Sequence, residues 1–161
     1  MSILKDGDID YATSYERART PRVFPAIQGP DLSDVLATTN MSVVRDLSLA
    51  YFATFNLSYP ILDRDFFLRH TLPSAIMEGF GNGIESCVVL ATMALGCWGK
   101  SALQEAGLDQ QSGIQFPDPS LDRWSSQDTP GLVLFIESKR RMTALLGDKS
   151  LQSCQCHLLL R

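Results

Sequence analysis

The sequence contains no Cys-X-X-Cys pair and almost no histidine, with His70 and His157 as its two examples. Structural zinc sites require four nitrogen or sulfur ligands at chelating spacings, and secreted disulfide scaffolds require a dense cysteine framework. The four cysteines fit neither pattern, and they are Cys87, Cys97, Cys154 and Cys156. We therefore expect reduced thiols, an intracellular protein and no metal or cofactor site within these residues.

Basic residues are also fewer than acidic ones: the sequence has 14 lysines and arginines and 18 aspartates and glutamates. The formal net charge is −4, and the isoelectric point lies near 5.0. Tight phosphate binding depends on clustered basic side chains that release counterions. The chain is therefore not expected to bind DNA directly, and any contact with DNA would run through a separate domain.

No apolar run is long enough to cross a membrane. The longest, residues 84–98, includes Glu85 and falls short of the roughly 20 residues that a spanning helix needs. The segment after Met1 lacks the apolar centre of a targeting peptide. We expect no membrane contact and interpret residues 84–98 as a buried central helix. A strand is the competing interpretation, which Val88 and Val89 favour, but strands are usually shorter.

The remaining composition indicates one domain with a long lead-in. Residues 1–40 carry three prolines and no sustained period, which is typical of a disordered segment or a linker. Residues 41–161 hold enough apolar side chains for one core. Within them, residues 100–128 turn polar and indicate a long variable loop. We expect an all-α fold, an irregular packed array of helices.

Helical spacing predicts the first helix of the domain, with Ser42 as its N-cap. Its apolar stripe is expected to consist of Val43, Leu47, Tyr51 and Phe55. Pro60 should end this helix, because proline lacks an N–H group and pushes the preceding Tyr59 toward extended geometry.

A short second helix is predicted directly after this turn. Asp63 can cap it, and Phe66, Phe67 and His70 would then lie within one turn of each other. Pro73 is expected to stop this helix. The result would be a tight helix–turn–helix unit.

The last third of the sequence predicts two more helices. The first of them should begin with Thr129 as N-cap and Pro130 at the first helical position, and it should end before Gly147. Its apolar face is expected to hold Leu132, Phe135, Ile136, Met142 and Leu146. Ser150 is expected to cap the second. The stripe of this last helix would consist of Leu151, Cys154 and Leu158.

The glycine-rich stretch at residues 79–83 precedes the central helix and could cradle a phosphate at the helix N-terminus. It lacks the lysine of a P-loop and the preceding strand of a dinucleotide-binding fold, so a plain loop is the better interpretation. Cys154 and His157 could share a helix face as metal ligands. Two ligands do not make a zinc site, so we interpret the cysteines as small core thiols.

Catalytic residues are not evident. Asp63 and Asp65 could pair as carboxylates, but acidic residues at a helix start usually cap the helix and offset its dipole. His70 and His157 lie outside any recognisable nucleophile and base arrangement. We therefore assign no catalytic, cofactor-binding or metal residue and do not expect an enzyme.

Lys139, Arg140 and Arg141 form the sharpest basic cluster, and a nuclear import signal or a phosphate contact is one interpretation of it. Three charges on a helix usually form a solvated face, which is the interpretation we prefer. Lys139 falls within the expected apolar face, so it should lie along the edge of the core or meet a carboxylate.

Three segments of residues 42–161 together resemble the fungal-specific transcription factor domain, the middle homology region of zinc-cluster regulators. They are YFATFNLSYPILDRDFF at residues 51–67, ESCVVLATMALGCWG at residues 85–99, and PGLVLFIESKRRMTALLG at residues 130–147 with LQSCQCHLLL at residues 151–160. They occur in the order of that family, with a long insert before the third. The Tyr-Pro-Ile-Leu-Asp turn at residues 59–63 is the most specific piece.

The resemblance implies an all-helical regulatory region that tunes an activator in the nucleus and acts on RNA polymerase II transcription. Such proteins bind DNA through a six-cysteine zinc cluster, which has no counterpart in these residues. Zinc is therefore expected only in a missing N-terminal domain. The family domain also continues beyond the point equivalent to Arg161, so the chain would be the first half of a larger helical domain. Protein partners or a homodimer are expected, with an effector that the sequence does not identify.

Two other classes of function stay open. One is a stand-alone helical module that binds a protein or a ligand through the apolar face of residues 151–160. The other is a small helical enzyme, which rests on His70 and the glycine-rich stretch alone.

Overall fold

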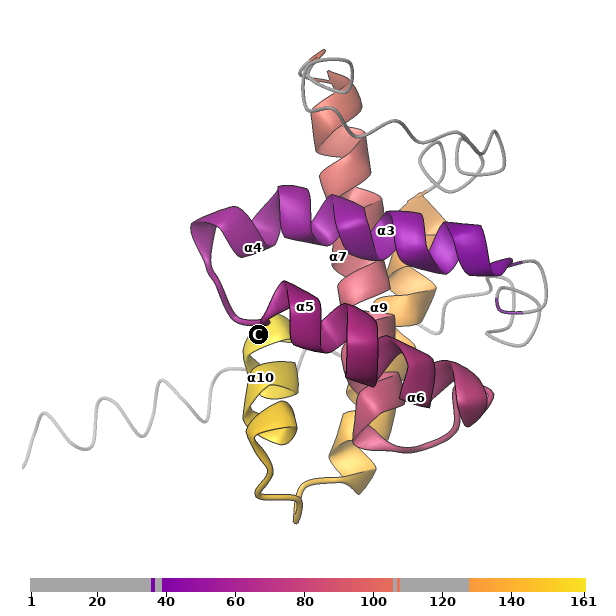
Figure 1. Cartoon of the computed structure of the whole chain (residues 1–161), viewed down its shortest axis with the longest axis vertical. Coiled ribbons are helices and arrows are strands. Elements are labelled where there is room, and N and C mark those ends of the chain that lie inside the picture. The colour runs from indigo at the N-terminus through magenta and orange to yellow at the C-terminus, as the bar shows by residue number, and fades with distance from the viewer. Residues whose placement is uncertain (1–35, 37–38, 106, 108–127) are drawn as a thin grey trace, which may run out of the picture.

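The computed structural model describes residues 36, 39–105, 107 and 128–161, and every regular element within these ranges is helical (Figure 1). The predicted all-α fold is confirmed for this part of the chain. The predicted linker at residues 1–40 lies outside the described residues except for residues 36, 39 and 40. Of the predicted variable loop at residues 100–128, residues 106 and 108–127 also lie outside the described residues, and residue 128 is helical.

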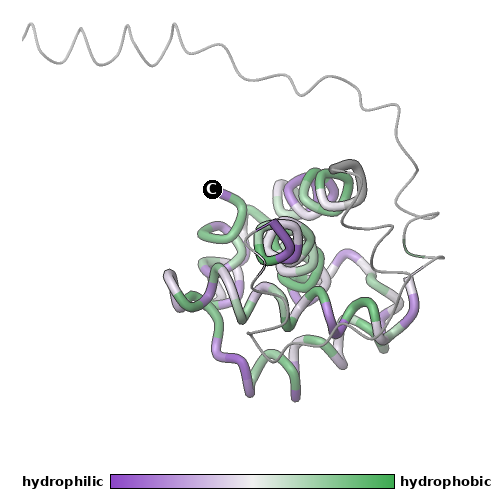
Figure 2. Tube along the Cα trace, turned by 90° about the horizontal axis from the view of Figure 1, so that it is seen from above, coloured by the Kyte–Doolittle hydropathy of each residue, from purple (hydrophilic) through white to green (hydrophobic). Residues whose placement is uncertain are grey.

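The centre of the fold is α7 (Ile84–Glu105), around which the other helices gather (Figure 2). The prediction of a buried central helix is confirmed, and α7 continues to Glu105, so residues 100–105 belong to the helix and not to the variable loop. The polar composition misled the prediction there, because Lys100 is only 2% exposed and extends the buried face. The length and composition of α7 would suit a membrane span, although 72% of its most apolar window is buried.

α3 (Met41–Ala53) crosses α7, and its N-cap is Asn40 instead of the predicted Ser42. The Oδ1 atom of Asn40 accepts a hydrogen bond from the Val43 N–H at 2.9 Å, and the Ser42 hydroxyl donates to the same oxygen at 2.5 Å. Asparagine and serine are both good caps, so sequence alone did not separate two candidates two residues apart.

Three residues of the predicted α3 stripe are buried: Val43, Leu47 and Tyr51. The fourth, Phe55, is 38% exposed and begins a separate short helix, α4 (Phe55–Ser58). As predicted, the chain leaves helical geometry before Pro60, since Tyr59 has a φ of −134° and a ψ of 88°.

The next helical stretch runs through α5 (Arg64–Phe66), the π-helical turn η1 (Phe67–Thr71) and α6 (Leu72–Met77). The predicted cap is confirmed, because Asp63 Oδ1 accepts a hydrogen bond from the Phe66 N–H at 2.7 Å. The prediction that Pro73 stops the helix is wrong. Pro73 lies in the first turn of α6, where its missing N–H is tolerated, and the wide turn η1 precedes it.

α9 (Asp128–Ala144) runs antiparallel to α7 and begins at Asp128, so Thr129 lies inside the helix and is not its N-cap. The predicted apolar face is correct only in part: Met142 is buried and Phe135 packs against the core, Leu132 and Ile136 are half-buried, and Leu146 is 70% exposed. The buried residues are Gly131, Leu134, Ser138, Arg141 and Met142. Small residues define this face because they allow close approach: a Cβ atom at Gly131 would lie 3.0 Å from the Cβ atom of Cys97.

The last helix, α10 (Leu151–Leu159), begins as predicted, with the Ser150 hydroxyl oxygen accepting a hydrogen bond from the Ser153 N–H at 3.1 Å. Its predicted apolar stripe is wrong, because Leu151 is 74% and Leu158 56% exposed and Cys154 is exposed too. The buried residues of this segment are Ser153, Cys156, Leu159 and Leu160. The helix therefore presents three apolar or thiol side chains to solvent.

The crossing of α3 and α7 depends on Gly96, because a Cβ atom at this position would overlap the backbone carbonyl group of Leu47. Replacing Gly96 with alanine should lower the free energy of unfolding by about 2–3 kcal/mol, since the two helix backbones would have to separate. Chemical denaturation followed by circular dichroism measures this loss.

Gly147→Ala is the matched control, because a Cβ atom at Gly147 meets nothing within 4 Å. We expect the control to leave the unfolding midpoint unchanged or slightly raised, as alanine restricts the unfolded chain. Equal midpoints for the two variants would contradict the close packing of α3 on α7.

Candidate functional site

The turn at residues 59–63 is organised by the side chain of Asn56. The Oδ1 atom of Asn56 accepts hydrogen bonds from the N–H groups of Ile61 and Leu62, both at 3.1 Å, and from the hydroxyl of Tyr51 at 3.0 Å. Its Nδ2 atom donates to the Leu62 carbonyl at 3.1 Å. The half-buried side-chain amide of Asn56 thus fixes the turn at residues 59–63, where Pro60 ends the helix.

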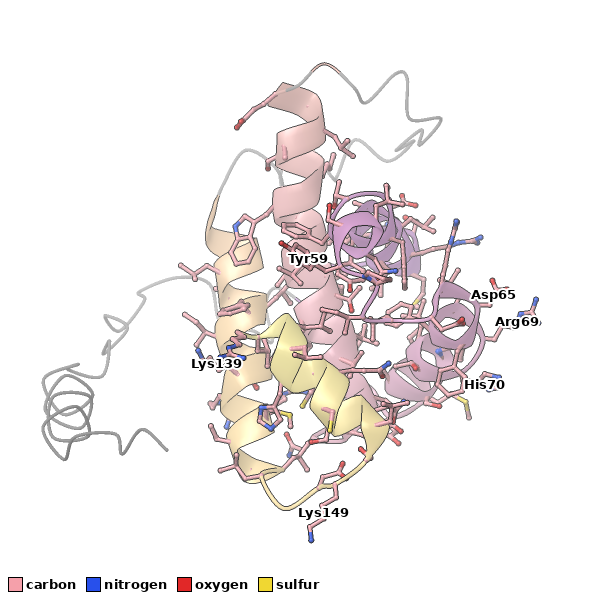
Figure 3. The ribbon with its side chains drawn as sticks, turned by 90° about the vertical axis from the view of Figure 1, so that its left-hand side faces the viewer. Tyr59, Asp65, Arg69, His70, Lys139 and Lys149 are labelled. Carbon is pink, nitrogen blue, oxygen red and sulfur yellow. The ribbon has the colours of Figure 1, made fainter. Side chains whose placement is uncertain are left out.

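α10 is attached to this segment by two glutamine side chains. Gln155 Nε2 donates to the Ile61 carbonyl at 2.9 Å, and Gln152 Nε2 lies 3.5 Å from the hydroxyl oxygen of Thr71. Figure 3 looks onto α10 with α5 and η1 beside it. The attachment brings the end of the chain against the turn at residues 59–63, about one hundred residues earlier in the sequence.

A pocket of about 580 Å³ lies between α10 and the stretch formed by α5 and η1. Phe66, Phe67 and Thr71 line one side, Leu151 and the two glutamines line the other, and Val88 of α7 also contributes. Phe67, Thr71 and Val88 are buried, whereas Phe66 is 52% exposed at the opening. The volume falls within the range of sites that bind small molecules.

A second hollow of about 350 Å³ lies at the C-terminal end of α10, where Leu158 and Leu159 line it. Its lining among the described residues carries no charged side chain and consists of Tyr51, Phe55, Tyr59, Ile61, Leu95, Leu158 and Leu159. Tyr59 is 72% exposed, and Figure 3 shows it above the end of α10. Concave surface therefore lies beside both ends of α10.

The glycine-rich stretch at residues 79–83 presents carbonyl groups and not an anion cradle. Arg141 Nη1 donates to the carbonyl oxygens of Phe80 and Gly81, at 2.5 and 2.6 Å. Phe80 has a φ of 55°, a left-handed conformation that is uncommon outside glycine and that this contact helps to hold. The interpretation as a structural loop agrees with this geometry.

The basic cluster divides into two kinds of side chain. Lys139 and Arg140 are exposed as expected, with Lys139 Nζ 5.8 Å from the centre of the Phe135 ring. The expectation of a solvated face is wrong for Arg141, which is 9% exposed and donates through Nε to Glu137 at 2.7 Å. Sequence reasoning missed this role, because the carbonyl acceptors lie some sixty residues earlier in the chain.

Glu137 joins the two arginines, since Arg140 also donates two hydrogen bonds to its carboxylate, at 2.6 and 2.7 Å. The hydrogen bond from Arg140 is the largest cause that lowers the pKa of the Glu137 carboxyl, and the one from Arg141 adds to it. Partial burial works in the opposite direction but does not prevail. The carboxylate is therefore more stable in the folded protein than in the unfolded chain.

The thiols lie mainly in the core, and all four are free. Burial raises the pKa of Cys97 and of Cys156 to about 12, so neither is a reactive thiolate at neutral pH. Cys154 is exposed, as is His157, the other half of the suggested metal pair. Within the described residues, no group of three or more histidine, cysteine, aspartate or glutamate side chains could hold a metal ion.

The remaining candidate catalytic residues do not lie together. His70 packs on the ring of Phe66 with a centroid distance of 5.0 Å and is exposed. Figure 3 places His70 with Asp65 and Arg69 on an outer edge, pointing away from the fold. Asp63 caps α5 and lines the pocket, so the suggested carboxylate pair does not share a site. The suggested catalytic residues therefore do not lie together in one site.

No protein-family model, curated protein or solved structure matches the chain. The resemblance to the regulatory region of zinc-cluster transcription factors therefore stays a prediction that rests on the three sequence segments. Function has to be inferred from the fold, the turn at residues 59–63 and the pocket beside α10.

Asn56→Ala should lower the free energy of unfolding by about 2–4 kcal/mol, because it removes the hydrogen-bond partner of the Leu62 N–H and carbonyl groups and of the Tyr51 hydroxyl. Ser58→Ala is the matched control, since Ser58 is an exposed residue of the same helix. Urea denaturation measures both. Similar losses for the two variants would mean that the amide does not organise the turn.

The stability contributed by Glu137 should depend on pH in the acidic range. Because folding lowers the pKa of this carboxyl, its contribution is fully present above the ordinary glutamate pKa of about 4.3 and is lost as pH falls through the lower, folded value. The difference in unfolding free energy between the wild type and Glu137→Gln should be constant from neutral pH to about pH 5 and shrink below it. In Arg140→Met the folded pKa of Glu137 should lie closer to the ordinary value, so the loss of stability on acidification should be smaller and should be complete at a higher pH. An unchanged profile would show that Arg140 is not what lowers this pKa.

Proposed function

We propose that this chain is the regulatory region of a fungal zinc-cluster-type transcription factor and regulates RNA polymerase II transcription in the nucleus. The observation that carries the proposal is the contact between Gln155 and the Ile61 carbonyl. It joins the third segment of the resemblance to the Tyr-Pro-Ile-Leu-Asp turn in the first. The second segment supplies α7, on which both pack. The three segments thus form one core, as parts of a single domain should.

The proposed role is regulatory and not direct DNA binding. A net charge of −4 disfavours binding to phosphate, and the one buried arginine of the basic cluster is committed to Glu137 and to the carbonyls of Phe80 and Gly81. DNA binding is therefore assigned to a zinc cluster outside these residues, with zinc as a cofactor of that cluster only. The surface beside α10 is assigned to protein partners, a second copy of the chain or an effector.

A stand-alone helical binding module is the second candidate, and a specific observation favours it. The exposed side of α10 carries Leu151 and Leu158, which are 74% and 56% exposed, between two apolar hollows. Exposed apolar surface of this kind marks interaction sites. Such a module would need no DNA-binding domain. An enzyme is the least supported candidate, since no catalytic residue is assigned.

A reporter experiment tests the proposal. The whole chain, fused to a heterologous DNA-binding domain in fungal cells, should change transcription of a reporter several-fold relative to the DNA-binding domain alone. A fusion with Tyr59→Ala and Leu158→Ala should lose most of the effect, because both side chains are exposed in the hollow beside α10. Immunoblots establish equal protein levels.

Two results would decide against a transcriptional role. An unchanged reporter, with the fusion present in the nucleus at normal levels, would contradict the proposal. If the purified chain nevertheless bound a protein or a small molecule through the surface beside α10, the stand-alone module would replace it. As a control, Ser58→Ala should retain the full reporter effect.

A further inference from the structure

The π-helical turn η1 places both of its terminal residues in the wall of the pocket beside α10. η1 closes with a hydrogen bond from the Leu72 N–H to the Phe67 carbonyl, five residues back. Phe67 and Thr71, the first and last residues of η1, both line the pocket and are both buried. π-Helical turns are rare and occur frequently at functional sites. The wall of the pocket therefore includes this irregular turn.

The hydroxyl of Thr71 has only one long hydrogen-bonding contact among the described residues. Thr71 is only 4% exposed, and its oxygen has a single contact, from Gln152 Nε2 at 3.5 Å. This distance is at the limit for a hydrogen bond, and no acceptor for the hydroxyl hydrogen occurs within the described residues. A buried polar group without a good partner is costly. A ligand with an acceptor atom would satisfy it.

The charges around the pocket disfavour an anion. Among the described residues no lysine or arginine lines it, and Asp63 is the charged residue of the lining. A negatively charged ligand would lose hydration without gaining a counter-charge and would be repelled by this carboxylate. A cation gains little, because Asp63 is exposed and already accepts the hydrogen bond that caps α5.

The remaining lining defines the apolar part of the ligand. Phe66 and Phe67 offer ring surface on one side, and Leu62, Val88 and Leu151 complete an aliphatic lining. Aromatic ligands pack well on such rings in offset or edge-on geometry. A volume of about 580 Å³ admits a compact molecule of one or two fused rings.

We propose that this pocket binds an uncharged small molecule that combines an aromatic ring system with a hydrogen-bond acceptor such as a carbonyl. The ring packs against Phe66 and Phe67, and the acceptor takes the hydrogen of the Thr71 hydroxyl. Gln152 supplies a second donor beside Thr71. The inference goes beyond the proposed function, because binding does not depend on whether the chain regulates transcription.

Fluorescence titration of the purified whole chain with two naphthalene probes tests the ligand class. The first probe is 6-propionyl-2-dimethylaminonaphthalene, an uncharged ring system with a ketone. The second is 8-anilinonaphthalene-1-sulfonate, an anion of comparable size. We expect saturable one-to-one binding of the ketone with a blue-shifted emission, and binding of the sulfonate at least about tenfold weaker. Absence of saturable ketone binding, or equal affinity for the anion, would overturn the proposal.

Two substitutions locate the site. Thr71→Val should weaken ketone binding by roughly threefold to tenfold through loss of one hydrogen bond, without lowering the melting temperature, because it removes a poorly satisfied hydroxyl. Leu151→Trp narrows the pocket opening from an exposed position and should weaken binding by about tenfold or more.

Leu158→Trp is the matched control, since Leu158 lies on the same helix but lines the other hollow and is also exposed. It should leave ketone affinity unchanged. If Leu158→Trp weakened binding and Leu151→Trp did not, the ligand would belong to the second hollow and the assignment would be wrong. Unchanged affinity in all three variants would likewise reject the pocket. Circular dichroism confirms that each variant is folded.

Discussion

The burial of residues 86–94 of α7 is the constraint on which the rest of this fold depends. Every side chain in this stretch is buried, so it has no face that can be left to solvent. A polar side chain in it can be satisfied within the helix, as when the Thr92 hydroxyl donates to the Val88 carbonyl at 2.7 Å. Neighbouring helices must therefore cover it from several directions, which explains why α3 crosses it and α9 lies alongside it.

The neighbours reach α7 closely because small residues occur at the contacts. Gly96 admits the backbone of α3, and Gly131 admits α9. Ser138 of α9 is fully buried and donates to the Cys87 carbonyl at 2.7 Å, which ties the two helices by a polar contact inside the core. Close packing of this kind leaves little room for larger side chains. The position of α10, and hence the two hollows beside it, follows from what remains uncovered.

Local chemistry in the sequence predicted the parts of the fold that depend on neighbouring residues. The caps at Asp63 and Ser150 and the chain break before Pro60 were correct, because each rests on groups within a few positions. The central position of α7 was also correct, since an apolar run without a polar face has to be buried. The apolar face of α9 was correct only in part, because Gly131 and Ser138 mark its buried side by their small size and not by hydrophobicity. The predicted stripe of α10 was wrong. The π-turn before Pro73 has no sequence signal that we recognise.

The candidate site was beyond the reach of the sequence for a related reason. Its walls come from η1, α7 and α10, and its position is fixed by Asn56 and Gln155, polar residues whose partners lie in backbone groups of the turn. A polar residue in a sequence does not reveal which distant carbonyl it will meet. The resemblance to a regulatory domain named no pocket residue, and the pocket had to be found in three dimensions.

The attachment of α10 has a consequence for how the protein unfolds. Its buried side chains are few and small, its outer side is exposed, and its polar attachment consists of one good hydrogen bond from Gln155 and one long contact from Gln152. Segments held in this way open in sub-global fluctuations well below the free energy of complete unfolding. α10 should behave as a separate cooperative unit, whose amide hydrogens exchange while those of α7 stay protected. Each opening of α10 would remove one wall of both hollows. A ligand bound in either hollow would therefore slow amide hydrogen exchange in α10.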